Sequence, residues 1–167
     1  MVVTGSVAGS VEFGGGVVNA SGAQEDSFLA KYNSIGTLLS AKIFASSGGS
    51  GRHSDGYSVT TDMLDNIYLT GRMHENLDLG GGVLVNGGPG SGSVDIYLGK
   101  FDASLTWVWS KRFGDSEAQV ATALSHDASS NRLVLVAWAQ GSVDFGTGAL
   151  AAPDPGTSAL TLAKFQP

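Results

Sequence analysis

The sequence has no cysteine, only 4 prolines and few charged residues (14%). Without cysteine, the chain forms no disulfide and offers no thiolate to a metal ion. No apolar run approaches the roughly 20 residues that a membrane-spanning helix needs. The opening residues, MVVTGSVAG, lack the basic region and apolar stretch of a secretory signal peptide, so we expect none in this chain.

Basic residues are also scarce. The chain has 9 Lys+Arg against 15 Asp+Glu, a formal net charge of −6. Nucleic-acid binding needs a basic stripe that displaces counterions from phosphates, and attraction to anionic membrane surfaces needs similar charge. We therefore expect no nucleic-acid partner and no membrane insertion. The 25 glycines and the low charge favour turns and strands over long helices.

What the sequence does contain is a repeat. The motif DSFLAKY at 26–32 returns as DIYLGKF at 95–101 and as ALTLAKF at 159–165. A glycine-rich motif recurs every 66 residues, as VEFGGG, LDLGGG and VDFGTG. Several motifs that return in the same order indicate a repeat architecture.

Each repeated motif has the composition of a short strand. In SFLAKY, Phe28, Ala30 and Tyr32 alternate with Leu29 and Lys31, which is the period of two that strands show. The connections DMLDN and DASSN suit tight turns. We expect each triple glycine to allow a turn or bulge in a small extra hairpin. A phosphate-binding loop is disfavoured, because neither a Lys-Ser/Thr pair nor a helix follows.

The motifs define four strand types: A (YSVTTD), B (IYLTG), C (IYLGKF) and D (WVWSKRF). They predict an all-β, β-propeller-like fold of about 2.5 four-stranded antiparallel blades, in the order BCD-ABCD-ABC. The expected single repeat domain has a partial blade at 1–45, a blade at 56–114 and a partial blade at 118–167. Such a ring is incomplete unless copies assemble. A β-sandwich or another β-meander is the alternative.

The segments DSFLAKYNSIGTLLSAKIF, DGYSVTTDMLDNIYLTG and SVDFGTG resemble the bacterial β-propeller repeats of the SBBP type, found in large secreted or cell-surface proteins. The resemblance spans nearly the whole chain. It departs in ALTLAKF, which lacks the Asp and the aromatic residue, and at Asp65 and Ser130, where the A–B turn of the family has glycine. The resemblance implies propeller architecture and export, and it brings no shared catalytic site.

Strand parity places the long connections together. In an antiparallel meander, the B–C and D–A connections emerge at one end, and the A–B and C–D turns at the other. The long segments are all of the first kind, and binding residues favour such loops on rigid scaffolds. The predicted ligand-binding residues on this loop-rich face are Arg52, His53, Asp55, Arg72, His74 and Glu75.

We expect these residues to be solvated, with no metal and no cofactor. His53 with Asp55, and His74 with Glu75, would form a polar or metal site only if their loops meet, and neither pair has ligand spacing on a regular element. No nucleophile elbow or catalytic triad order is present, so we expect no catalytic residues and no enzyme activity. We expect the tryptophans to fill gaps between blades, with stacking on sugars as the alternative.

The repeated lysines, Lys31 and Lys100, share a strand face with the leucine two positions earlier. An almost buried lysine needs a carboxylate partner, for which Asp62 and Asp127 are candidates. A lysine whose ammonium group reaches the rim is the alternative.

These features predict a non-enzymatic structural, adhesion or interaction module of an exported bacterial protein, secreted or at the cell surface. Uncovered strand edges and sheet faces favour association. We therefore expect a homo-oligomer formed through blade edges, or contact with further repeats of a parent chain. The alternatives are a carbohydrate-binding, lectin-like propeller and a fragment of a larger propeller enzyme. A glycan or a surface protein is the expected ligand.

Overall fold

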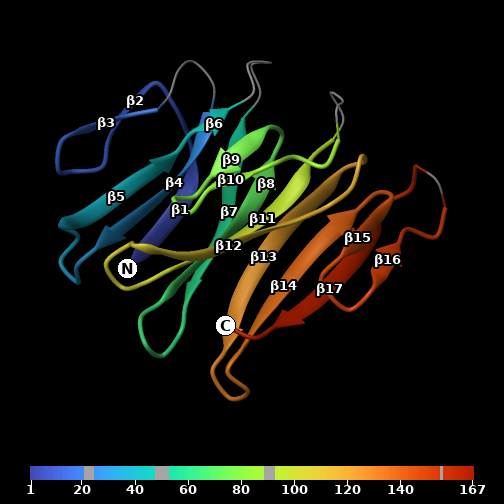
Figure 1. The fold of residues 1–167 in the computed structure, drawn as a ribbon. Coiled ribbons are helices and arrows are strands. Elements are labelled where there is room, and N and C mark those ends of the chain that lie inside the picture. Colours follow the sequence, from blue (N-terminus) through green and yellow to red (C-terminus); the bar gives the residue numbers. More distant parts are fainter. Residues whose placement is uncertain (21–24, 48–52, 89–92, 155) are drawn as a thin grey trace.

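The computed structural model describes residues 1–20, 25–47, 53–88, 93–154 and 156–167, which form strands and turns with no helix. Three larger antiparallel sheets lie side by side, with the second sheet between the first and the third (Figure 1). Among the described residues, no sheet closes into a barrel. The predicted all-β, antiparallel class is confirmed. None of the described segments forms a helix long and apolar enough to cross a membrane.

The three sheets contain the ten strands that the motifs predict, each in meander order. The first sheet, in the order β1-β4-β5, consists of β1 (Val2–Ala8), β4 (Glu25–Tyr32) and β5 (Leu38–Phe44). The second, in the order β12-β11-β8-β7, consists of β7 (Ser54–Thr61), β8 (Ile67–Met73), β11 (Asp95–Phe101) and β12 (Trp107–Phe113). The third, in the order β13-β14-β17, consists of β13 (Gln119–Asp127), β14 (Arg132–Ala139) and β17 (Ala159–Phe165). We call each sheet with its neighbouring hairpin the first, second or third unit.

A short hairpin lies between the B and C strands of each unit. The hairpin strands are β2 (Ser10–Glu12) with β3 (Val17–Asn19), β9 (Asn76–Asp78) with β10 (Val83–Leu84), and β15 (Ser142–Asp144) with β16 (Ala149–Ala151). The strand β6 (Ser46–Ser47), at the end of the first unit, pairs with β9 of the second.

The glycine-rich motif forms the turn of these hairpins, as predicted. The Asp78 carboxylate accepts the backbone N–H groups of Gly80 and Gly82, at 2.7 and 3.1 Å. Asp144 accepts the equivalent amides of the third unit at the same two distances. Amides that bind an internal carboxylate are not available to a phosphate.

Two apolar clusters fill the spaces between the units. One, between the first and second sheets, contains Leu29, Leu69 and Tyr97. The other, between the second and third, contains Leu98 and Leu135. All five are 0% exposed. The second sheet is thus covered on both faces, which explains why its strands are apolar on both sides.

The A–B and C–D turns are tight, and each is stabilised by the same kind of side-chain to backbone hydrogen bond. Each begins with an Asn or Asp whose side chain accepts a backbone amide two residues later; these residues are Asn33, Asp62, Asp102 and Asp127. The left-handed residue of the A–B turn is Asp65 (φ 61°) in the second unit and Asn131 (φ 47°) in the third. Assigning the glycine position to Ser130 is therefore wrong by one residue.

The repeated lysines take different partners. The Lys31 ammonium donates to the backbone carbonyl of Ala103, at 2.5 Å. Lys100 lies 5.2 Å from the ring centroid of Tyr68. Both side chains are half-buried, so the expected burial against a carboxylate is wrong for them. Asp127 does form an ion pair, but with the third equivalent lysine, Lys164, at 3.5 Å.

Candidate functional site

Polar side chains from three strand ends meet at the loop-rich end of the molecule. His53 directly precedes β7, His74 directly follows β8, and Asp55 and Arg72 are cross-strand partners on these two strands. The first residue of β4, Glu25, joins them from the first unit. We call these residues the loop-end cluster: Glu25, His53, Asp55, Arg72 and His74.

An ion pair forms the centre of the cluster. The Arg72 Nε donates to Asp55 Oδ2 at 2.6 Å, and Asp55 is only 4% exposed. The second Arg72 nitrogen lies 3.3 Å from His53 Nε2, which is itself 3.5 Å from Asp55 Oδ2. The rings of His53 and His74 lie with their centroids 4.6 Å apart. Charge-assisted contacts of this length hold the side chains in fixed orientations.

The structure therefore brings four of the six predicted site residues together. Expecting them to be separately solvated is wrong for His53, Asp55, Arg72 and His74, because pairing of β7 with β8 aligns their strand ends. Glu75 lies between β8 and β9 and is 9% exposed, so it is not a solvated loop residue either. The sixth predicted residue, Arg52, lies outside the described residues.

Sequence reasoning missed two members of this region, Glu25 and Tyr57. Tyr57 is 41% exposed, and its ring centroid lies 5.5 Å from the Arg72 guanidinium carbon. Partial burial and the neighbouring Asp55 carboxylate raise the pKa of the Tyr57 hydroxyl. Glu25 begins a C strand, and strand parity places the start of every C strand at the loop-rich end. That signal was present in the sequence.

A metal ion is disfavoured although ligand atoms are close. Glu25, His53 and Asp55 each place one potential ligand atom within 4.8 Å of the others. However, the positive guanidinium of Arg72 already binds Asp55 and repels a second cation there. The arrangement offers acceptors, donors and one exposed ring, which suits a polar organic ligand with hydroxyl or charged groups.

The ion pair is specific to the second unit. The cross-strand pair Asp55–Arg72 corresponds in the third unit to Val120–Trp138, which has the same position in the ladder. An apolar pair thus satisfies the same backbone geometry. A buried ion pair is in general weak evidence for stability, because burying charges is costly. The fold therefore does not require charges at this position.

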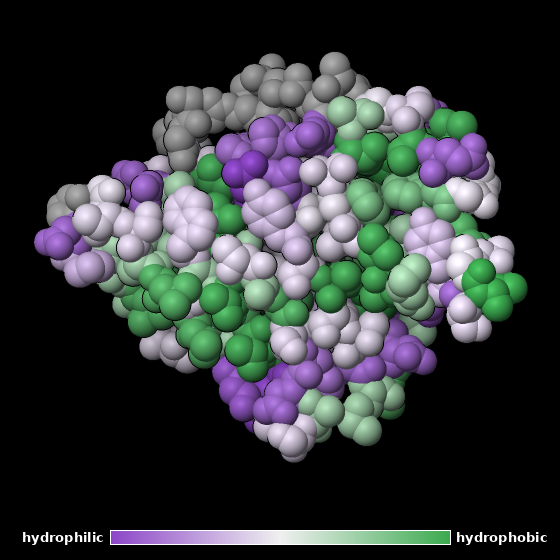
Figure 2. Space-filling model, turned by 180° about the vertical axis from the view of Figure 1, so that it is seen from behind, coloured by the Kyte–Doolittle hydropathy of each residue, from purple (hydrophilic) through white to green (hydrophobic). Residues whose placement is uncertain are grey.

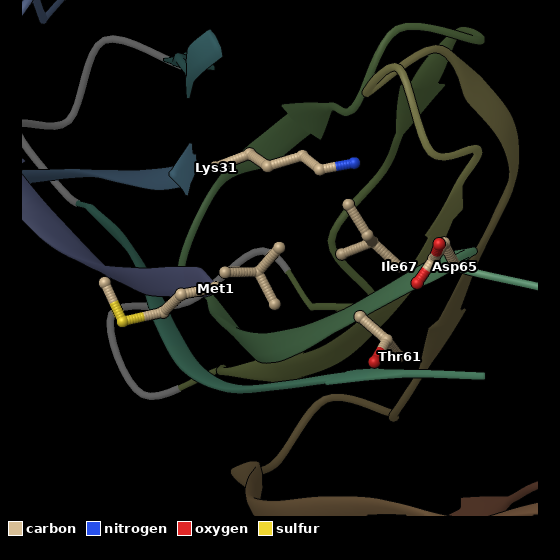
Figure 3. A pocket seen from close by; sticks show the side chains of 6 residues that line it. Met1, Lys31, Thr61, Asp65 and Ile67 are labelled. Carbon is tan, nitrogen blue, oxygen red and sulfur yellow. The ribbon is translucent and has the colours of Figure 1, made fainter. Parts of the chain in front are cut away.

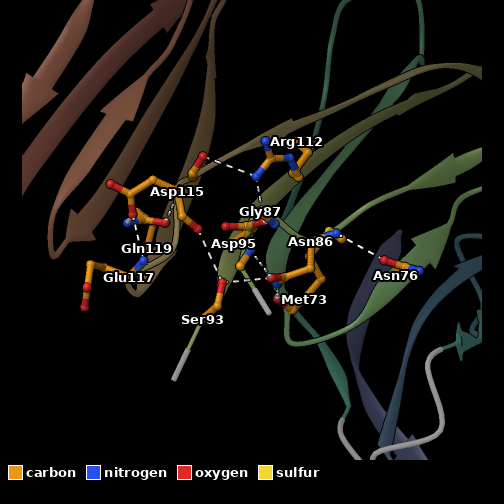
Figure 4. Close-up of polar contacts among 12 residues, drawn as sticks. Met73, Asn76, Asn86, Gly87, Ser93, Asp95, Arg112, Asp115, Glu117 and Gln119 are labelled. Carbon is orange, nitrogen blue, oxygen red and sulfur yellow. Dashed lines mark hydrogen bonds and ion pairs between the residues drawn. The ribbon is translucent and has the colours of Figure 1, made fainter. Parts of the chain in front are cut away.

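A second polar network connects the second and third units (Figure 4). Arg112 donates to Asp95 Oδ2 at 2.8 Å, and Asp95 is 0% exposed. The Gln119 amide donates to Asp115 Oδ1 at 2.7 Å and to the backbone carbonyl of Gln140 at 2.6 Å. Burial raises the pKa of the Asp95 carboxyl, against the opposing effect of the hydrogen bond from Arg112.

This network explains the Asp that opens the repeated motif. In the first unit, the equivalent residue Asp26 accepts the backbone N–H of Ser46 at 3.0 Å. In the second unit, Asp95 accepts the backbone N–H of Gly87 at 2.6 Å. In both units, the carboxylate thus holds a neighbouring segment beside the start of its C strand. The third unit has Ala159 at this position, and within the described residues its sheet contains no D strand. We assign the motif Asp a structural role.

Clefts recur between units at the turn end. One, of about 160 Å³, is lined by Lys31 and Asp65 among others (Figure 3). Another, of about 480 Å³, is lined by their equivalents Lys100 and Asn131. The first is smaller than the roughly 300–1,000 Å³ of typical ligand pockets. Repetition of the cleft shows that it arises from the way successive units pack.

The tryptophans of the D strand contribute to packing. Trp107 and Trp109 are partly buried against the two apolar clusters, and Trp107 donates from Nε1 to the Ser110 hydroxyl at 3.3 Å. The exposed aromatic ring beside the polar cluster is therefore Tyr57 and neither of these tryptophans.

No family model and no curated protein matches this chain.

Proposed function

We propose that the chain is a non-enzymatic interaction module of propeller-type repeats from an exported bacterial protein, with the loop-end cluster as its recognition site. The observation that carries this proposal is the ion pair between the half-buried Arg72 and the buried Asp55, for which the third unit substitutes Val120–Trp138. Repeated strands, sheet packing and capped turns account for the rest of the chain as scaffold. A rigid scaffold with one variable loop-rich end is a common design for binding proteins.

Carbohydrate binding is the second candidate function, and Tyr57 favours it. An exposed ring beside an arginine and two carboxylates can contact the apolar face of a sugar while neighbouring groups bind its hydroxyls. The cluster combines donors, Arg72 and His53, with acceptors, Asp55 and Glu25. It would select a ligand by directed hydrogen bonds.

The experiment displays the chain on a bacterial surface and measures attachment of the cells to host cells and to a glycan array. The decisive variant is Asp55→Val/Arg72→Trp, which copies the third unit's pair and leaves no unpaired charge. We expect attachment to fall at least about tenfold, because hydrogen bonds to charged groups contribute roughly 1.5–3 kcal/mol.

The matched control is Arg132→Ala, which removes an arginine at the opposite, turn end. It should leave attachment unchanged. Attachment that persists in Asp55→Val/Arg72→Trp would refute the cluster as the recognition site. Attachment to host cells without any glycan signal would remove the carbohydrate candidate and keep the interaction module.

A further inference from the structure

Each of the two outer faces of the molecule is equivalent to a face that is buried between units elsewhere in the chain. In β11, Ile96 and Leu98 are 0% exposed, because the third unit covers them. Their equivalents in β17, Leu160 and Leu162, are 80% and 64% exposed. The neighbouring strand β14 adds three residues that pair with β17 on the same side of the sheet as these leucines: Val134, Val136 and Trp138. We call this surface the rear face of the third unit, and the equivalent side of each other unit is its rear face.

The opposite side of the molecule carries a matching front face on the first sheet. Leu69 and Leu135, which face the preceding unit, are both 0% exposed. Their equivalent in β1, Val3, is only half-buried, as is Phe28, the equivalent of the fully buried Tyr97. Phe28 packs on Phe13 with ring centroids 4.9 Å apart. In space-filling view from behind, hydrophobic residues gather in patches between hydrophilic areas (Figure 2).

The structure itself shows what fits each face. At both internal interfaces, a rear face packs on the front face of the next unit. A polar contact accompanies the first of them, where Lys31 donates to the Ala103 carbonyl of the second unit. The equivalent residue of the third unit, Lys164, has a side chain that is 49% exposed. The rear face of the third unit is therefore built to receive a front face like that of the first unit.

We infer that the rear face of one copy binds the front face of a second copy, head to tail, in a closed dimer. This inference rests on the repeat architecture in the proposed function. Head-to-tail contacts close into rings or continue as filaments. The described residues of each copy form three units. Closed propellers typically have about four to eight blades, a range in which six is the only multiple of three. Two copies give a ring of six blades that can close head to tail.

The occupant is a second copy because the chain already contains both complementary surfaces. The exposed leucines of the rear face, Leu160 and Leu162, favour association. The net charge of −6 per copy opposes it by long-range repulsion, which salt screens. Dimerisation should therefore strengthen as ionic strength rises, which is the opposite of an interface held by ion pairs.

The test is sedimentation velocity of the 167-residue chain across the micromolar range. We expect wild type at twice the 17.0 kDa chain mass. Leu160→Lys/Leu162→Lys should alter the rear face, and Val3→Lys the front face. Each should raise the dimer dissociation constant at least about tenfold. The control Met63→Lys/Leu64→Lys places the same charges at residues 79% and 81% exposed in the A–B turn, and it should remain dimeric.

An equimolar mixture of the rear-face and front-face variants tests polarity. Each variant keeps one intact face, so the mixture should form heterodimers through one wild-type contact, while the second contact carries both sets of substitutions. These heterodimers should be weaker than the wild-type dimer and tighter than any dimer that either variant forms alone. Circular dichroism confirms that each variant is folded. A wild-type monomer at all concentrations, a rear-face variant that stays dimeric, or a mixture without heterodimers would each overturn the inference. These readouts are independent of attachment through the loop-end cluster, so the two proposals can fail separately.

Discussion

The turn-capping carboxylates show how single residues fix this fold. Hydrogen bonds from the Ser104 and Ser129 side chains and from nearby amides hold the pKa values of Asp102 and Asp127 below their usual range. Burial tends to raise the pKa of Asp62, but hydrogen bonds from Asn66 and Tyr68 outweigh it and lower the pKa. All three turns are therefore stabilised by ionised carboxylates.

Asp62→Asn should destabilise the protein at neutral pH and have little effect in acid. Asn retains one carbonyl oxygen for the turn amides, as Asn33 does in the first unit. It loses the charge and the acceptor Oδ2, which the Tyr68 hydroxyl donates to at 2.8 Å. Because the folded pKa lies below the unfolded one, this stabilisation is present above about pH 4 and disappears as pH falls through the folded pKa.

Thermal unfolding at about pH 7 and about pH 2 measures the difference, with an expected loss of about 1 kcal/mol at the higher pH only. Asp65→Asn is the matched control, since Asn also adopts the left-handed conformation found there (φ 61°). An equal loss at both pH values would show that charge is not the source of the stabilisation.

At the scale of elements, the glycine-rich hairpins of the first and second units are each shaped by the D strand of their own unit. A Cβ on Gly81 would lie 2.0 Å from the Trp107 ring at the start of β12, and one on Gly15 would lie 2.9 Å from Leu38 at the start of β5. In the third unit, the equivalent residue is Thr147, and the part of the chain that the structure describes adds no D strand to that sheet. The middle glycine is therefore required by packing.

Gly81→Thr should destabilise the chain by about 1–3 kcal/mol, the usual cost of overpacking. The reverse change, Thr147→Gly, should cost no more than about 1 kcal/mol, through backbone entropy alone. Urea unfolding measures both. In a Trp107→Ala background, the cost of Gly81→Thr should vanish, and an unchanged cost would exclude the ring as its cause.

The same elements show how far the sequence alone could lead. Alternating residues and recurring turns predicted all ten strands, because each is a local pattern repeated in order. Strand parity predicted that His53 and Arg72 share one end of the molecule. The same parity places Glu25 at this end, but it could not reveal that Glu25 contacts the cluster from another sheet, since packing between sheets leaves no local pattern. The partners of the Lys31 and Lys100 side chains could not be predicted either, because they too depend on three-dimensional packing.

At the scale of the molecule, the three units differ chiefly in what covers them. The second sheet is buried on both faces, whereas the first and third each bury one. Equivalent residues thus experience different surroundings in one chain. A substitution made at each of two equivalent positions separates the effect of burial from that of strand sequence and backbone geometry.

Leu98→Ala and Leu162→Ala make this comparison on the C strands of the second and third units. Leu98 is 0% exposed, so its loss should cost about 2–5 kcal/mol at every protein concentration. Leu162 is 64% exposed in one copy, so its loss should change the unfolding of dilute, monomeric protein by no more than about 0.5 kcal/mol. A dimer makes stability depend on concentration. Raising the protein concentration should therefore stabilise wild type and Leu98→Ala more than Leu162→Ala in urea unfolding. Equal stabilisation of all three would mean that Leu162 contributes nothing to the interface.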